Sequence, residues 1–242
     1  MPAWRITTFE YDVPVERLLR RRLTEEQASF SLRALPSGAE VTVRGKDGQA
    51  HLAKAASRML LRDFQYLVLA RMTDAMPLTL GEKRAVLTDA LQSARRREEA
   101  EPVQAALNEY FSTEDALCAD GFLHFRMQDS LMLWQLCVEQ AASRVLLQKE
   151  YGELMQALHT YVQGQRCRME VLHIRLNRDG SCILSDGGAF VIEYADASPD
   201  GIVRLLADMA PKTLVIHDQS GGTQEQLCEA LRQVFSGRVR ME

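Results

Sequence analysis

The feature of this sequence that most constrains its fold is a long helical repeat that ends just before a strand pattern. Between residues 131 and 162, apolar side chains recur every three or four positions, which is the period of one face of an α-helix. This run predicts a helix of more than thirty residues. From residue 169 the apolar side chains alternate, with Leu172, Ile174 and Leu176 on one side, which is the period of a β-strand.

The segment before this repeat is also helical in pattern. Residues 49–76 contain no Gly or Pro and place apolar side chains at helical spacing, which predicts one long helix. Residues 78–97 predict a second helix, in which Thr79 and Glu82 have the spacing of a capping box. Pro102 favours a new helix through residue 111. We therefore expect residues 49–166 to form a helical region.

Strand patterns are concentrated at the two ends of the chain. Residues 3–11 predict a strand, residues 15–26 a helix, and residues 29–35 and 39–45 a hairpin. Together these segments predict a small β-α-β-β unit within residues 1–48.

The C-terminal region, residues 167–242, has the pattern of a β-meander followed by α/β elements. Turn residues at 177–180 and 185–188 separate three alternating runs, the third over residues 189–194. A helix capped by Ser198, a buried strand, a helix opened by Thr223 and a last strand follow. The expected fold class is α+β, with a predominantly helical middle of long helices, a strand-bearing N-terminal unit and a C-terminal unit of β-meander and α/β elements. We expect residues 1–242 to form a single compact chain.

Composition argues against several classes of protein. The chain has 242 residues, 46% of them hydrophobic, which is enough for a sizeable core. Its net charge of −4 argues against general binding to nucleic-acid backbones. Five Cys residues are scattered without a CxxC pair, so no metal site is expected. We also expect no cofactor. We find no signal-peptide pattern and no apolar stretch of about 18 residues, so we expect a cytoplasmic protein without a membrane span.

Two arginine clusters stand out, at residues 17–23 (RLLRRRL) and 94–98 (ARRRE). On a helix, Arg17, Arg20 and Arg21 share a face, while Leu18, Leu19 and Leu23 take another. Such clusters are usually the solvated side of an amphipathic helix. The alternative is an anionic partner, either nucleic acid or an acidic protein surface.

The segment 217–223 (HDQSGGT) is a candidate ligand loop between a predicted strand and a predicted helix. Gly221 and Gly222 would let an anion approach the backbone, Thr223 would cap the helix, and Asp218 could hold a metal or a ribose. The alternative is an ordinary connection between strand and helix. No arrangement of nucleophile, base and orienting group is visible, so we assign no catalytic residue.

The segment 120–131 (DGFLHFRMQDSL) places two aromatic residues one turn apart where the long helix begins. We expect Phe122 and Phe125 to form a hydrophobic plug, with Arg126 as a structural residue. His173 lies in the middle of a predicted strand and is expected to be buried and hydrogen-bonded. The alternative for His173 is a pH-sensitive or catalytic role.

In this order, these segments resemble the YtxC-like family of sporulation proteins. That family has a Gly-Phe-x-x-Phe-Arg-hydrophobic segment, a helix with Lys-Glu-Tyr, an aromatic-Val-x-x-Gln end and a strand carrying Val-His. The matching positions here are Gly121, Phe122, Phe125, Arg126 and Met127; Lys149, Glu150 and Tyr151; Tyr161, Val162 and Gln165; and Leu172-His173. The similarity is clear over residues 120–176, whereas the first 110 residues match only in layout. Ser130 stands where the family has an aromatic residue.

The resemblance implies a cytoplasmic, sporulation-associated protein of unknown biochemical activity, and it supplies no catalytic residues. We expect the family positions to hold the fold together rather than to form a site, namely Phe122, Phe125, Arg126, Lys149, Glu150, Tyr151 and His173. The expected function is binding to a partner protein or self-association rather than catalysis. The alternative is a protein for a phosphate or nucleotide ligand, or an enzyme, that uses the loop from Asp218 to Thr223.

Overall fold

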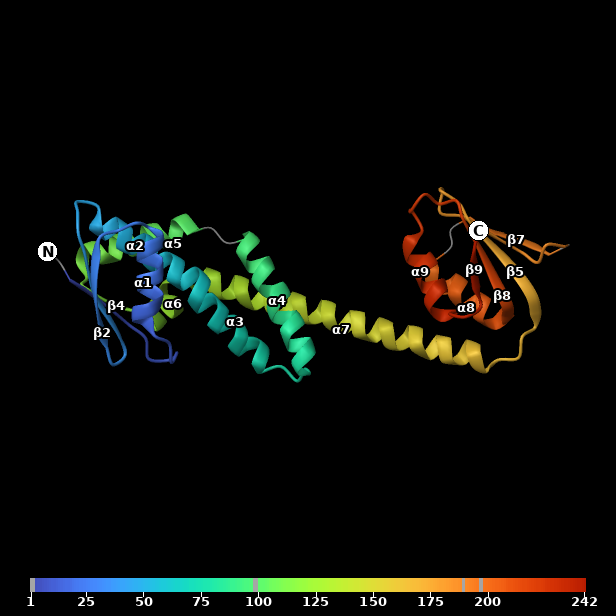
Figure 1. Cartoon of the computed structure of the whole chain (residues 1–242), viewed down its shortest axis with the longest axis horizontal. Helices are drawn as coiled ribbons and strands as arrows, with labels where there is room; N and C mark the ends of the chain where they lie inside the picture. Colours follow the sequence, from blue (N-terminus) through green and yellow to red (C-terminus); the bar gives the residue numbers. More distant parts are fainter. Residues whose placement is uncertain (1–2, 98–99, 189, 196–197) are drawn as a thin grey trace. The chain divides into compact units, whose positions relative to one another are not determined.

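The computed structural model describes residues 3–97, 100–188, 190–195 and 198–242. Contacts group the chain into two compact units, Met1–Leu146 and Leu147–Glu242 (Figure 1). Each unit has a mixed β-sheet and a hydrophobic core of its own, so the N-terminal and C-terminal strands do not share one sheet. The α+β class expected from the sequence is confirmed.

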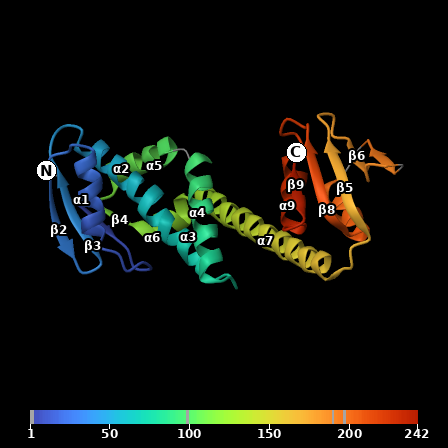
Figure 2. The same cartoon turned by 45° about the vertical axis from the view of Figure 1, so that its right-hand side comes forward.

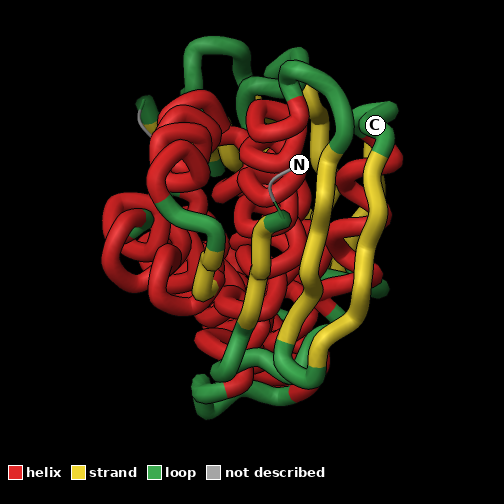
Figure 3. The backbone as a smooth tube through the Cα atoms, turned by 90° about the vertical axis from the view of Figure 1, so that its left-hand side faces the viewer, coloured by secondary structure: helices red, strands yellow, loops and turns green. Residues whose placement is uncertain are grey.

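The sheet of the first unit has the strand order β2-β3-β1-β4. β1 (Trp4–Thr7) runs antiparallel to β3 (Gly38–Val43), which forms the predicted hairpin with β2 (Phe30–Leu35), and parallel to β4 (Ala116–Cys118). Alternation along β1 and β3 buries Ile6 and Val41, whereas Arg5 pairs with Glu40 on the other face. The helices cover the buried face, so that in Figure 3 the strands lie in front of them.

The helices of the first unit follow the predicted pattern in sequence, except that a separate short helix, α6 (Ala119–Arg126), precedes the long one. They are α1 (Val15–Glu25), α2 (Gly48–Arg58), the π-helical segment η1 (Met59–Phe64), α3 (Gln65–Asp74), α4 (Leu80–Arg97), α5 (Ala100–Thr113) and α6. The capping box before α4 is confirmed, because the Thr79 N–H donates to Glu82 at 2.7 Å and the Glu82 N–H donates to the Thr79 hydroxyl at 3.4 Å.

The run from α2 to α3 is continuous, as predicted, but its middle is π-helical rather than α-helical. Leu52, Ala56, Leu60 and Phe64 recur every four residues, and all four are fully buried. An α-helix has 3.6 residues per turn, so a four-residue repeat drifts around it. The wider π-turn keeps these side chains facing one core, and it also sets the direction of Arg62 and Asp63 on η1.

The long helix predicted from residues 131–162 is α7 (Gln128–Gly164), and the boundary between the two units falls within it. This grouping differs from the sub-regions drawn on the sequence, residues 1–48, 49–166 and 167–242. One reason is that β4, from residues 116–118, completes the sheet formed by residues 4–43.

The second unit has a sheet of order β7-β6-β5-β8-β9. β5 (Met169–Leu176), β6 (Cys182–Ser185) and β7 (Val191–Tyr194) form the predicted antiparallel meander, although its Ala189 lies outside the described residues. β8 (Pro211–Asp218) and β9 (Val239–Met241) continue the sheet in parallel. α8 (Pro199–Met209), α9 (Glu225–Val234) and residues of α7 pack on its buried face. Figure 2 shows α9 beside the strands of this sheet. Ser198 caps α8, as predicted.

Within the described residues, no helix is both long and apolar enough to cross a membrane.

Candidate functional site

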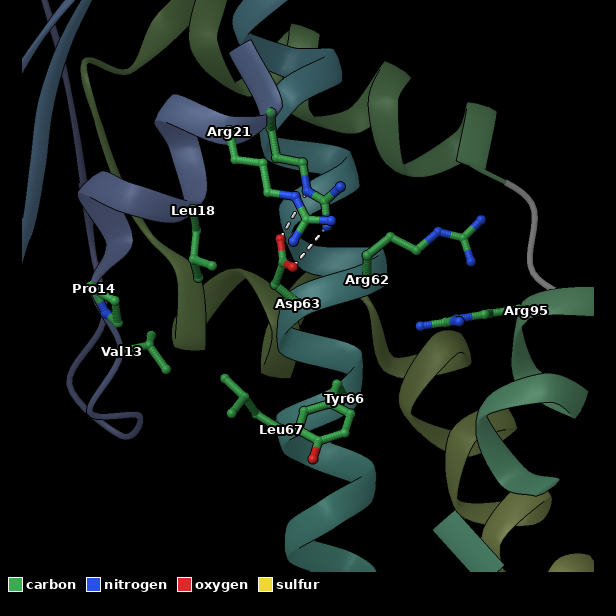
Figure 4. Close-up of a pocket in the computed structure, with 10 residues that line it drawn as sticks. Val13, Pro14, Leu18, Arg21, Arg62, Asp63, Tyr66, Leu67 and Arg95 are labelled. Atoms are coloured by element: carbon green, nitrogen blue, oxygen red, sulfur yellow. Dashed lines mark hydrogen bonds and ion pairs between the residues drawn. The ribbon is translucent and has the colours of Figure 1, made fainter. Parts of the chain in front are cut away.

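The most distinctive site of the first unit is a groove lined by arginines (Figure 4). Two cavities of about 510 and 440 Å³ share Arg22, Arg62 and Arg95 among their lining residues, and we call them together the arginine groove. Five arginines line it, Arg21, Arg22, Arg58, Arg62 and Arg95, against the two carboxylates of Glu25 and Asp63. The lining residues alone thus carry an excess of three positive charges in a chain whose net charge is −4, although Arg58 is also paired with Glu26 outside the lining.

Four helical segments position these arginines: α1, the contiguous segments α2 and η1, and the distant α4. On α1, burial of Leu19 and Leu23 turns the arginine-bearing side toward η1. On α4, Val86, Ala90 and Ala94 are buried at a spacing of four residues, which leaves Arg95 exposed beside them. The two arginine clusters of the sequence therefore contribute to one site, although Glu98 of the second cluster lies outside the described residues.

Arg22 is the structural anchor of the groove. It is 7% exposed and binds Asp63 in a fork, with its Nε 2.9 Å from Oδ2 and its Nη2 2.7 Å from Oδ1. Its Nη1 also donates to Glu25 at 3.0 Å. Burial lowers the pKa of Arg22, but the hydrogen bonds to Asp63 and Glu25 outweigh it, and the pKa is raised overall. The charge of Arg22 is therefore compensated within the protein.

Arg62 and Arg95 differ from Arg22 because their side chains are exposed and no carboxylate among the described residues pairs with them. Their side chains point toward each other from η1 and α4 (Figure 4). Within the described part of the chain, neither forms an ion pair with a carboxylate. Two like charges that converge raise the local positive potential, and guanidinium groups present forked donors that match carboxylate and phosphate oxygens. This part of the groove is suited to an anion.

The other end of the groove is apolar. Val13, Pro14, Leu18 and Leu67 line it together with Tyr66, whose side chain is 48% exposed. A cavity of this size with apolar walls and a few charged groups has the general character of a ligand site. The arrangement favours a ligand with an anionic group next to an apolar one.

The family positions of the first unit do not form a common core. Phe122 is buried and packs edge to face on Tyr110, with ring centroids 5.9 Å apart. Phe125 is 79% exposed and Arg126 is also exposed, so the expectation of a plug formed by both phenylalanines is wrong. The short helix α6 ends at Arg126, and its buried face holds Phe122 and Leu123 but not Phe125.

The family positions of the second unit lie on two different elements. Lys149, Glu150 and Tyr151 are exposed on α7. His173 is half-buried on β5, and its Nδ1 lies 3.0 Å from Nε2 of His217, with the two rings stacked. His173 is therefore hydrogen-bonded, as expected, but to a second histidine.

The candidate ligand loop from Asp218 to Thr223 uses its own hydrogen-bonding groups. Asp218 accepts from the Ser220 N–H and hydroxyl, at 3.0 and 2.6 Å, which lowers the pKa of Asp218. The Ser220 hydroxyl oxygen accepts from the N–H groups of Gly222 and Gln224. Thr223 does not cap α9, which begins at Glu225 after Gln224. The donors that an anion would need are largely occupied within the loop.

A cavity of about 550 Å³ nevertheless lies beside this loop. Gly222 and Thr223 line it, together with the carboxylate of Glu225. Gly221 has a positive φ and lies near the Arg178 side chain. Across the described residues, no group of three or more His, Cys, Asp or Glu side chains could hold a metal ion.

Arg62 and Tyr66 are two of the groove residues that the sequence did not single out, together with Arg58 and Asp63. Arg62 and Tyr66 lie within a run of apolar residues, and the one available signal is that an arginine and an aspartate interrupt this run at positions 62 and 63. The two arginine clusters were interpreted separately, because nothing in a single sequence shows that α1 and α4 line the same groove.

Comparison with known proteins gives one match. The sequence profile of the YtxC-like family matches residues 74–240, which extends well beyond the similarity seen in residues 120–176 and includes α4 with Arg95. No curated protein and no solved structure matches the chain. Because the match covers most of the chain, this protein belongs to the YtxC-like family.

Proposed function

We propose that this protein is a sporulation-associated, cytoplasmic binding protein that acts without catalysis and holds an acidic segment of a partner protein in the arginine groove. The observation that carries the proposal is the pair Arg62 and Arg95, whose exposed charges converge without a carboxylate partner among the described residues. The association with sporulation rests on the family resemblance.

An acidic protein segment fits the groove better than a nucleic acid does. A nucleic-acid backbone binder needs an extended basic face, and its affinity grows with the number of phosphates that it contacts. Here the excess positive charge is confined to a short groove, and one end of that groove is apolar. A peptide that carries a carboxylate beside an apolar side chain could fill both ends.

Binding can be tested with a fluorescently labelled peptide of glutamate and leucine, followed by fluorescence anisotropy. We expect Arg62→Gln and Arg95→Gln each to weaken binding by about tenfold, since a charge-assisted hydrogen bond contributes roughly 1.5 to 3 kcal/mol. Arg17→Gln is the matched control, because Arg17 is exposed on α1 and does not line the groove. Equal affinities of all three variants would contradict the proposal.

The biological role is tested by replacing the gene in its own host. We expect the double variant Arg62→Glu/Arg95→Glu to lower the yield of heat-resistant spores as much as a deletion does, while Arg17→Gln leaves the yield normal. A deletion strain with normal spore yield would show that the protein is not needed for sporulation. A deletion phenotype that the double variant does not share would show that the protein acts through another surface.

The alternative, a phosphate or nucleotide ligand at the loop from Asp218 to Thr223, is favoured by the cavity beside that loop. Calorimetric titration with ATP tests it. Binding that is lost in Gly222→Val, at a position where φ is +92°, would support a ligand or substrate at this loop.

A further inference from the structure

In the second unit, α7 carries a stripe of exposed apolar side chains. Leu147, Tyr151, Leu154 and Tyr161 are 46–65% exposed, and Leu158 is partly buried between them. We call these five residues the apolar stripe. Their spacing of four, three, four and three residues is the heptad spacing of a seam between two helices.

The stripe lies beside the face of α7 that packs in the second unit, and of its five residues Leu158 packs partly against that core. Met155 and Val162 are buried in the core. On the same side, His159 Nδ1 lies 3.0 Å from the Val234 carbonyl, and the Gln163 side chain donates to the Ser236 carbonyl at 2.9 Å. Leu147, Tyr151, Leu154 and Tyr161 are not among the described residues that pack in this core. An exposed row of large apolar side chains is a common mark of an interaction surface.

An acidic groove adjoins the stripe at Tyr151. This cavity of about 410 Å³ lies between α7, α8 and α9, and is lined by Tyr151, Pro199, Asp200, Gln226, Glu229, Ala230 and Gln233. Two of these residues are carboxylates, and no Lys or Arg occurs among the described residues that line the groove. Glu150 adds a further exposed carboxylate next to Tyr151 on α7.

We propose that the apolar stripe and the acidic groove together form a docking surface for a basic amphipathic helix of a partner protein. The heptad spacing calls for a helix whose own apolar side chains pack against Leu147, Leu154 and Tyr161. From residue 147 to residue 161 the stripe is about 21 Å long, which matches roughly four turns of a partner helix. Tyr151 lies where apolar and acidic parts meet, a position typical of residues that dominate binding energy.

Charge decides between a basic partner and a second copy of this chain. Asp200 and Glu229 would attract lysines or arginines on the flank of the docked helix. If two copies paired through the stripe, each would bring its own Glu150 and acidic groove to the contact, which like charges disfavour. The occupant that complements this surface is therefore a basic helix from another protein. This surface belongs to the second unit and does not depend on the arginine groove.

The test uses the full chain and a labelled model peptide of about three heptads, with leucine at the seam positions and lysine elsewhere. The control peptide has the same composition with the leucines scattered around the helix. We expect the seam peptide to bind at micromolar concentration and the scattered peptide to bind at least tenfold more weakly. Tyr151→Ala and Leu154→Ala should each weaken binding of the seam peptide at least tenfold, and Glu229→Gln by about threefold.

Met132→Ala is the matched control, because Met132 is 70% exposed on α7 but lies in the first unit. It should bind the seam peptide like the wild type, and thermal unfolding should show that all variants are folded. Equal binding of both peptides would overturn the proposal, as would equal affinities of Tyr151→Ala and Met132→Ala. Sedimentation tests whether two copies of the chain pair through the apolar stripe. A wild-type dimer that becomes a monomer in Tyr151→Ala would also overturn the proposal.

Discussion

The two units of this protein carry grooves of opposite charge. Five arginines face two carboxylates in the first unit, whereas the groove of the second unit has Asp200 and Glu229 with no lysine or arginine among its described lining residues. The net charge of −4 is a sum over the whole chain and describes neither of the two grooves. A modest overall charge therefore excludes a uniformly basic protein, but it does not exclude a local site for an anion.

The arginine groove and the apolar stripe also differ in how many elements build each of them. In the first unit, Arg22, Arg62 and Arg95 come from three helical segments, and their meeting depends on the tertiary fold. In the second unit, the apolar stripe lies on α7 alone, so its spacing is already present in the sequence. The arginine groove should accordingly be sensitive to the stability of its unit, and the apolar stripe should not.

The largest effect is expected from Asp63→Ala. This change leaves the guanidinium of Arg22 buried without its forked partner, and breaking a buried ion pair costs about 3 kcal/mol or more. Both tryptophans, Trp4 and Trp134, are buried in the first unit, so their fluorescence during urea unfolding reports on that unit.

The matched comparison for Asp63 has two parts. The double variant Arg22→Met/Asp63→Leu should recover most of the lost stability, because it removes both charges. Glu229→Ala, in the other groove, should change the unfolding free energy by less than about 0.5 kcal/mol. A small effect of Asp63→Ala would mean that Arg22 does not anchor the groove.

The next largest effect is expected from reversing the two exposed charges of the arginine groove. Arg62→Glu/Arg95→Glu leaves three arginines against four carboxylates at the groove. The acidic peptide should then bind about 100-fold more weakly, or about 2.7 kcal/mol. Binding of the seam peptide at the apolar stripe should not change, and anisotropy with both peptides checks this. Parallel losses for both peptides would show that the two surfaces are not independent.

Much of the fold could be predicted because the local sequence patterns and the tertiary packing favour the same helices and strands. The heptad-like repeat of residues 131–162 predicts α7, and the alternation of Leu172, Ile174 and Leu176 predicts β5 with its buried face. Ser198 and Thr79 act as caps, as expected, since a side chain three residues away from the donor needs no tertiary contact. Thr223 does not cap, because α9 begins two residues later, at Glu225, and the Thr223 hydroxyl donates back to the Ser220 carbonyl.

The candidate site could not be predicted to the same degree. Phe125 is an aromatic residue of the kind that is usually buried, but it lies on the solvent side of α6. Its spacing of three residues from Phe122 fits one helix face and did not predict this exposure. The convergence of Arg62 and Arg95 depends on the π-turn of η1 and on the placement of α4. Both are tertiary features, so a sequence pattern of either segment alone does not contain them.

A smaller effect is expected from salt, which should weaken peptide binding at the arginine groove more than at the apolar stripe. Binding of the acidic peptide to the arginine groove rests on exposed charges, which are screened over about 10 Å at 0.1 M salt. Raising the salt from about 0.05 to 0.3 M should weaken this binding about tenfold, whereas seam-peptide binding should weaken only about twofold because apolar contacts carry most of it. Equal salt dependence in the two titrations would show that charge dominates at the apolar stripe as well.

The smallest effect is expected from replacing Glu25, a residue of the arginine groove whose ionisation makes the stability of the first unit depend on pH. The hydrogen bond from Arg22 lowers the pKa of Glu25 below its ordinary value of 4.5. A carboxylate with a lowered pKa stabilises the folded state above that ordinary value, and the contribution is lost as the pH falls through the lowered pKa. Glu25 is 37% exposed, so solvent screening limits this contribution to less than about 1 kcal/mol.

Glu25→Gln should therefore unfold more easily than the wild type at pH 7, as followed by tryptophan fluorescence, and the difference should shrink steadily below pH 4.5. A difference that persists unchanged in acid would show that Glu25 supports the groove by its shape rather than by its charge.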